Sequence, residues 1–165
     1  MNGSSNWKND LCKGEKGENR VVIYLNKHFK EVVDTRYDKQ YQADDVDFIL
    51  TSKQDHEFTF ELKTDYKISK TGNVLFATYN DRQTGRYEDW ALKTKAKFIG
   101  IFDIYNDKLY IINWEKFKPH LNGFKEINWY NYSDKCWSYG RLASLQTLID
   151  KGYVIQTIDI AQYCA

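Results

Sequence analysis

The spacing of hydrophobic residues in the first part of the chain predicts a helix followed by a hairpin. Between residues 11 and 29, apolar side chains recur at Val21, Leu25 and Phe29, which is the spacing of one helix face. Residues 42–50 and 58–64 instead alternate apolar and polar positions, as strands with one buried face do. The polar segment 51–57 between them predicts an antiparallel hairpin.

The rest of the chain continues with short elements of both kinds. We expect strands at 74–79, 98–104, 108–113 and 154–158, short helices at 87–95 and 114–121, and a helix at 140–151 that ends at Gly152. The order is helix, three strands, short helix, strand and then a C-terminal helix/strand extension. With 165 residues, the chain fits one α/β domain with a mixed sheet, with a core at about 10–104 and the extension at about 105–165.

The hairpin register follows from aligning apolar positions. One register brings them all together, pairing Val46 with Leu62, Phe48 with Phe60 and Leu50 with Phe58. On the other face the same register places Asp47 opposite Glu61, with Cβ atoms about 5 Å apart. Lys63 is two residues further along and shares that face.

Two facing carboxylates repel each other unless a cation lies between them. A shared divalent ion removes this penalty, and Mg²⁺ prefers such hard oxygen ligands together with waters and a substrate phosphate. Lys63 would then orient a nucleophile or stabilise developing negative charge. The alternative is a solvated outer sheet face with ordinary alternating charges.

A third carboxylate continues the apolar face of the first helix. One turn before Val21, this face reaches Glu18, so an acid extends the side that otherwise points into the protein. The alternative is a solvent-facing acid that the helix dipole favours in the first turns.

The charge balance, the cysteines and the lack of long apolar runs each limit the kind of protein that the sequence encodes. Twenty-four basic and 23 acidic residues give a net charge of +1, so a nucleic-acid surface would have to be local. Cys12, Cys136 and Cys164 lack the spacing of a zinc site and fit reduced thiols. Without an apolar run long enough for a membrane span or a signal peptide, the sequence favours the cytoplasm.

Local charge favours an anionic substrate near the hairpin. Between residues 61 and 97 there are eight basic and five acidic residues, although a solvated loop would explain the same surplus. The basic side chains that we expect to contact nucleic acid are Lys67, Lys70, Arg82, Arg86, Lys93 and Lys95.

The residues of the hairpin resemble the signature of the PD-(D/E)XK nuclease superfamily. Asp47 in DDVDFIL is followed fourteen residues later by Glu61 in FTFELKTD, and Lys63 comes two residues after Glu61. Many resolvase-like members also carry a G-x-x-G-E pattern on the first helix, which here is residues 14–18 and ends at Glu18. The segment KTDYKISKTGNVLFAT is similar to small phage and bacterial members, but Ala77-Thr78 and Ala96-Lys97 stand where those often have acidic residues.

This resemblance implies a restriction-endonuclease-like αβββαβ core. It implies that Asp47, Glu61 and the Leu62 backbone carbonyl bind Mg²⁺ or Mn²⁺, that Glu18 completes or tunes the metal shell, and that Lys63 assists hydrolysis. We therefore expect a metal-dependent deoxyribonuclease in which a metal-activated water attacks the phosphodiester. The alternatives are a Holliday-junction resolvase, which would act as a homodimer, and a nucleic-acid-binding protein that does not cleave.

Overall fold

The computed structural model of the chain describes residues 17–163, which form an N-terminal helix, two sheets and several short helices. The helix covers residues 17–28. The larger sheet has the order β1-β2-β3-β6-β7-β10, with strands Glu31–Asp34, Phe48–Thr51, Glu57–Asp65, Phe98–Asp103, Lys108–Asn113 and Val154–Asp159. The smaller sheet has the order β5-β4-β9-β8, with strands Gly85–Glu88, Asn73–Arg82, Cys136–Ser144 and Lys125–Asn131.

Short helices join these strands. They are α2 (Lys39–Ala43), α3 (Ile68–Thr71), α4 (Trp90–Lys93), α5 (Trp114–Phe117), α6 (Leu145–Asp150) and the 3-10 segments η1 (Lys118–Gly123) and η2 (Ala161–Tyr163). Since β3 pairs with β6 in parallel while the other neighbours are antiparallel, the predicted mixed α/β fold is confirmed. No helix within residues 17–163 is long and apolar enough to span a membrane.

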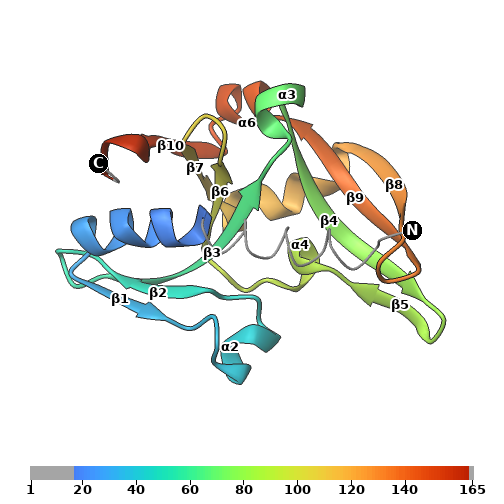
Figure 1. The fold of residues 1–165 in the computed structure, drawn as a ribbon, viewed down its shortest axis with the longest axis horizontal. Coiled ribbons are helices and arrows are strands. Elements are labelled where there is room, and N and C mark those ends of the chain that lie inside the picture. The colour runs from blue at the N-terminus through green and yellow to red at the C-terminus, as the bar shows by residue number, and fades with distance from the viewer. Residues whose placement is uncertain (1–16, 164–165) are drawn as a thin grey trace.

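The six-stranded sheet has a hydrophobic cluster on each face. On one face, Val21 and Leu25 of the N-terminal helix pack with Phe60 and Leu62 of β3. The other cluster joins Ile99 and Ile101 of β6 to the four-stranded sheet and to α4 and α5, and its further members include Val74, Phe76, Trp114, Phe117 and Ala143. Figure 1 shows the helix and the four-stranded sheet on opposite sides of β3. Both faces of the central strands are therefore covered.

The structure differs from the predicted elements in three places. Residues 42 and 43 of the predicted strand are helical, as the end of α2, whose first turn is capped by the Asp38 side chain accepting a hydrogen bond from Gln40 N. Residues 140–144 belong to β9, and the predicted helix is confined to Leu145–Asp150. Strands β1, β5 and β8 have no counterpart in the prediction.

The order helix, three strands, helix, strand is present, but its strands differ from the predicted ones. The three are β1, β2 and β3, followed by α4 and β6, because the predicted third strand is β4 of the other sheet. The C-terminal extension also supplies strands to both sheets, since β7 and β10 join the larger one and β8 and β9 the smaller one. Residues 10–16 of the predicted core lie outside the described residues.

Candidate active site

The hairpin of β2 and β3 has the predicted register. Phe48 pairs with Phe60 and Leu50 with Phe58. The ladder between the two strands ends at the pair Phe48–Phe60, and Asp47, the residue before Phe48, is bound to β3 by two further hydrogen bonds. Its backbone N–H donates to Phe60 O at 3.0 Å, and its carboxylate Oδ2 accepts from Leu62 N at 2.8 Å. Asp47 therefore lies beside β3 at the position of Glu61 and Leu62, as predicted.

Glu61 lies on the inner face of the sheet. It is 1% exposed, and the parallel pairing of β3 with β6 places it beside Ile99 and Lys63 beside Ile101. These isoleucines belong to the cluster that packs against the four-stranded sheet. The interpretation of a solvated outer sheet face is therefore wrong for Glu61, because that alternative did not foresee a second sheet covering this side.

Glu61 and Lys63 form an ion pair between the Lys63 amine and Glu61 Oε1. The amine also lies over the Trp90 ring, 5.5 Å from its centroid, and the side chain is 34% exposed. The other carboxylate oxygen, Glu61 Oε2, is buried and has no hydrogen-bond partner among the described residues. A buried oxygen without a partner is costly, which makes this atom a candidate ligand.

The electrostatics of the three groups are strongly coupled. Burial raises the pKa of Glu61 to about 8; the Lys63 charge opposes this, and the nearby Asp47 and Asp45 charges add to it. Burial likewise raises the pKa of Asp47, against the opposing charge of Lys63. Burial alone would lower the pKa of Lys63, but the charges of Glu61, Asp47 and Asp45 outweigh it, so its pKa is raised. Two carboxylates with raised pKa values next to one cation attract further positive charge.

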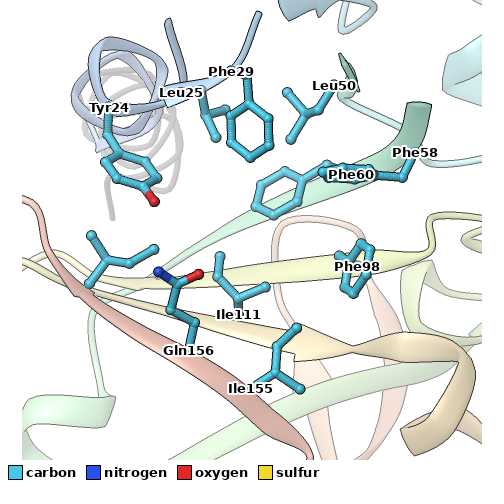
Figure 2. A pocket seen from close by; sticks show the side chains of 11 residues that line it. Tyr24, Leu25, Phe29, Leu50, Phe58, Phe60, Phe98, Ile111, Ile155 and Gln156 are labelled. Atoms are coloured by element: carbon cyan, nitrogen blue, oxygen red, sulfur yellow. The ribbon is translucent and has the colours of Figure 1, made fainter. Parts of the chain in front are cut away.

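A cleft of about 410 Å³ opens beside Lys63. Lys63, Thr64 and Lys67 line it from β3 and the following segment, while Leu75 and Leu142 line it from the four-stranded sheet. A different pocket of about 130 Å³ lies by the N-terminal helix, where Figure 2 shows Tyr24, Phe29 and Phe60 pointing toward one another. Its described lining contains no charged side chain, whereas Lys63, Asp65 and Lys67 line the cleft.

The described residues fit a metal ion only in part. Within residues 17–163, no group of three or more His, Cys, Asp or Glu side chains lies close enough together to hold one. Two carboxylates remain, those of Asp47 and Glu61, and Glu61 Oε2 has no hydrogen-bond partner among the described residues. This small set matches the way proteins hold Mg²⁺, with one or two carboxylates and the other positions left to water and substrate.

Glu18 is held by a residue that the sequence did not single out. Arg36, between β1 and α2, donates to Glu18 Oε2 at 2.9 Å and to Asp34 Oδ2 at 2.6 Å. These bonds, first of all those to Asp34, raise the pKa of Arg36, and its charge also acts on Asp47. Its guanidinium lies over the Phe48 ring, 5.1 Å from the centroid. Glu18 is thus linked to the site through Arg36, while residues 14–16 of the G-x-x-G-E pattern lie outside the described residues.

The six predicted nucleic-acid contacts are exposed but do not form one patch. Lys67 lines the cleft, and Lys70 lies over the Tyr105 ring. Lys93 and Lys95 pair with carboxylates at the rim of the site, at 3.1 Å from Asp45 and 2.8 Å from Asp44 respectively. The remaining two, Arg82 and Arg86, lie on the β4–β5 hairpin, where Arg86 pairs with Asp81.

Comparison with known proteins gives one structural likeness. The solved structure of a bacterial homing endonuclease, I-Ssp6803I, is similar to this chain with a TM-score of 0.48 and 14% sequence identity, over 66% of this chain and 72% of that one. No family model and no curated protein sequence matches the chain.

Proposed function

We propose that the chain is a metal-dependent nuclease that hydrolyses DNA phosphodiester bonds at the cleft beside Lys63. The observation that carries the proposal is the buried carboxylate pair Asp47 and Glu61. Among the described residues, Glu61 Oε2 has no hydrogen-bond partner, while Glu61 Oε1 pairs with the Lys63 amine. A buried carboxylate oxygen without a protein partner is costly, and a bound ion would remove that cost.

Each residue has a distinct role in this proposal. Asp47, Glu61 and the Leu62 carbonyl would hold Mg²⁺ or Mn²⁺, and the hydrogen bond from Leu62 N fixes the orientation of the Asp47 carboxylate. The ion would supply Lewis-acid polarisation of the phosphate and a more acidic water. Lys63 positions a phosphate oxygen at the mouth of the cleft and stabilises the negative charge that develops on it. Glu18 acts through Arg36 as a positioning residue.

The test is cleavage of labelled linear, nicked, flap, four-way-junction and single-stranded DNA in Mg²⁺, Mn²⁺ or EDTA. The wild type should cut in either metal and not in EDTA, and Glu61→Gln should lower the rate by about 100-fold or more, as loss of a main electrostatic group does. Glu115→Gln is the matched control, because Glu115 is exposed on α5. Calorimetric titration with Mn²⁺ should show binding by the wild type and Glu115→Gln, and weaker binding by Glu61→Gln.

One observation favours a second candidate, a protein that binds DNA without cutting it. The described residues bring only two carboxylates together at the site, and Lys63 already neutralises one of them. This candidate predicts DNA binding without cleavage of any substrate. In the calorimetric titration with Mn²⁺, it predicts no difference between the wild type and Glu61→Gln. A preference for the four-way junction, together with a dimer on that DNA, would instead identify a resolvase.

A further inference from the structure

The four-stranded sheet extends beyond the helices that cover part of it. One face carries Phe76. The centroid of its ring lies 5.8 Å from that of Trp90 in α4 and 4.9 Å from that of Phe117 in α5. Towards the β4–β5 and β8–β9 hairpins, the same face continues without these helices, and large side chains become exposed. Figure 1 shows these two hairpins beyond α4 at the end of the molecule.

The strand register places five side chains that can stack on this face. One row across the sheet runs Arg86, Asp81, Trp137 and Tyr130, and the next, two residues along each strand, contains Tyr79 and Tyr139. Residues directly opposite each other in antiparallel strands share a face, and so do residues two apart. Together with Tyr132 in the β8–β9 turn, they form what we call the aromatic platform, made of Tyr79, Arg86, Tyr130, Tyr132, Trp137 and Tyr139.

Three rings of the platform are exposed, and one of them contacts the other two. Tyr132 is 84% exposed, Trp137 49% and Tyr130 38%. Tyr130 lies at the centre, with its ring 5.0 Å from Tyr132 and 5.6 Å from Trp137. Arg86 lies over the Tyr139 ring at 4.7 Å. Exposed aromatic residues that cluster in this way are unusual for a surface without a partner.

Unpaired basic side chains border the platform. Arg82 and Lys135 lie in the two neighbouring turns and line a hollow of about 390 Å³ with Gln83, Thr84 and Asp134. Within the described residues, neither cation forms an ion pair, although Arg82 lies over the Tyr87 ring, 5.9 Å from its centroid. Planar rings for bases, next to cations that no carboxylate neutralises, are the two parts of a surface that binds single strands.

We propose that the aromatic platform binds an unpaired stretch of a DNA strand by stacking its bases on Trp137, Tyr130 and Tyr132, with Arg82 and Lys135 contacting the phosphates. The inference rests on the proposed nucleic-acid role of the chain, but not on cleavage. It therefore assigns the preferred substrate class, which is DNA with a single-stranded segment, such as a flap or a frayed end. Adjacent strands lie about 4.8 Å apart, so neighbouring rings can each accept one base of a splayed strand.

The test measures binding in EDTA, so that catalysis does not contribute. Fluorescence anisotropy compares a labelled single strand of roughly 12 nucleotides, within the usual site sizes, with a blunt hairpin duplex. The double substitution Trp137→Ala with Tyr132→Ala should raise Kd for the single strand by roughly 25-fold or more, since each of the two stacked bases contributes about fivefold or more. Binding of the duplex should change less than about threefold by comparison.

Matched variants separate stacking from folding. Trp137→Phe keeps a ring and should retain most of the affinity, while Tyr132→Ala alone removes a side chain in an exposed turn and leaves the sheet intact. Ile155→Ala is the control, because Ile155 is 53% exposed on β10 of the other sheet. Circular dichroism melts of every variant check that the fold is retained.

Three results would overturn the inference. These are an unchanged Kd in the double variant, an equal loss for single strand and duplex, or self-association that disappears with the rings, which would make the platform an interface between two copies. Single-strand binding by the wild type that is lost in the double variant, without cleavage of any DNA in Mg²⁺ or Mn²⁺, would refute the proposed nuclease and leave the platform standing.

Discussion

The buried carboxylate of Glu61 should make the metal-free protein less stable as the pH rises. Its pKa is about 8 in the folded protein, against 4.5 as the ordinary value. Between these two pH values the folded protein holds a proton that the unfolded chain has released, so the free energy of unfolding falls as the pH increases. At about 1.4 kcal/mol for each pKa unit, the whole change corresponds to roughly 5 kcal/mol.

Glu61→Gln removes this titration while keeping a side chain of similar shape. We expect the variant and the wild type to have similar stability near pH 4.5, and the variant to be more stable by several kcal/mol above pH 8 in EDTA. The variant loses the ion pair with Lys63. Because the Lys63 side chain is 34% exposed, its amine keeps contact with water, and the loss of the pair costs little stability.

Urea denaturation followed by tryptophan fluorescence measures the free energy of unfolding of both proteins from pH 5 to pH 9. The difference between them isolates Glu61 from the other titrating groups, and Glu115→Gln should show no such pH dependence. A difference that stays constant with pH, or a wild type that is the more stable protein at pH 9, would refute the reasoning. Added Mg²⁺ should restore stability to the wild type and not to Glu61→Gln.

Three further predictions concern the neighbours of the site. Lys63→Met should reduce cleavage by about 100-fold in saturating Mg²⁺ with little change in DNA affinity, measured by single-turnover kinetics beside anisotropy; an equal loss in affinity would contradict its role at the phosphate. Arg36→Ala should lower the free energy of unfolding by about 2 kcal/mol, because it leaves Glu18 and Asp34 without their charged partner, and Arg36→Lys should recover less than half of this, as urea titration would show. Gly100→Ala should lower the melting temperature by several degrees, since its Cβ would collide with the buried Phe60 ring; an unchanged melting curve would show that β3 and β6 can move apart at little cost.

The candidate site could be predicted from the sequence because it is built from a local hairpin. Aligning the apolar residues was sufficient to place Asp47 beside β3, since a shift by one residue would turn Phe48 and Phe60 away from the core. The burial of Glu61 could not be predicted in this way. It depends on β4 and β9 forming a second sheet over that face, and pairings between strands distant in the sequence leave no local pattern.

Arg36 was missed for a related reason. Its position follows from the pairing of β1 with β2, and β1 has only four residues, of which Val32 and Val33 are the only apolar ones. So short a strand at a sheet edge has almost no alternation to detect. No signal in the segment around Arg36 distinguishes it from other arginines near acidic residues.

The four-stranded sheet is built entirely from two insertions into the larger one. Strands β4 and β5 lie between β3 and β6, and β8 and β9 lie between β7 and β10. The hairpin that carries Asp47, Glu61 and Lys63 contributes no strand to it. Mutation and recombination can therefore lengthen the hairpins of the second sheet or exchange its exposed rings, while the strand segments that cover Glu61 stay as they are. If both proposals hold, the surface that selects the strand evolves separately from the residues that cut it.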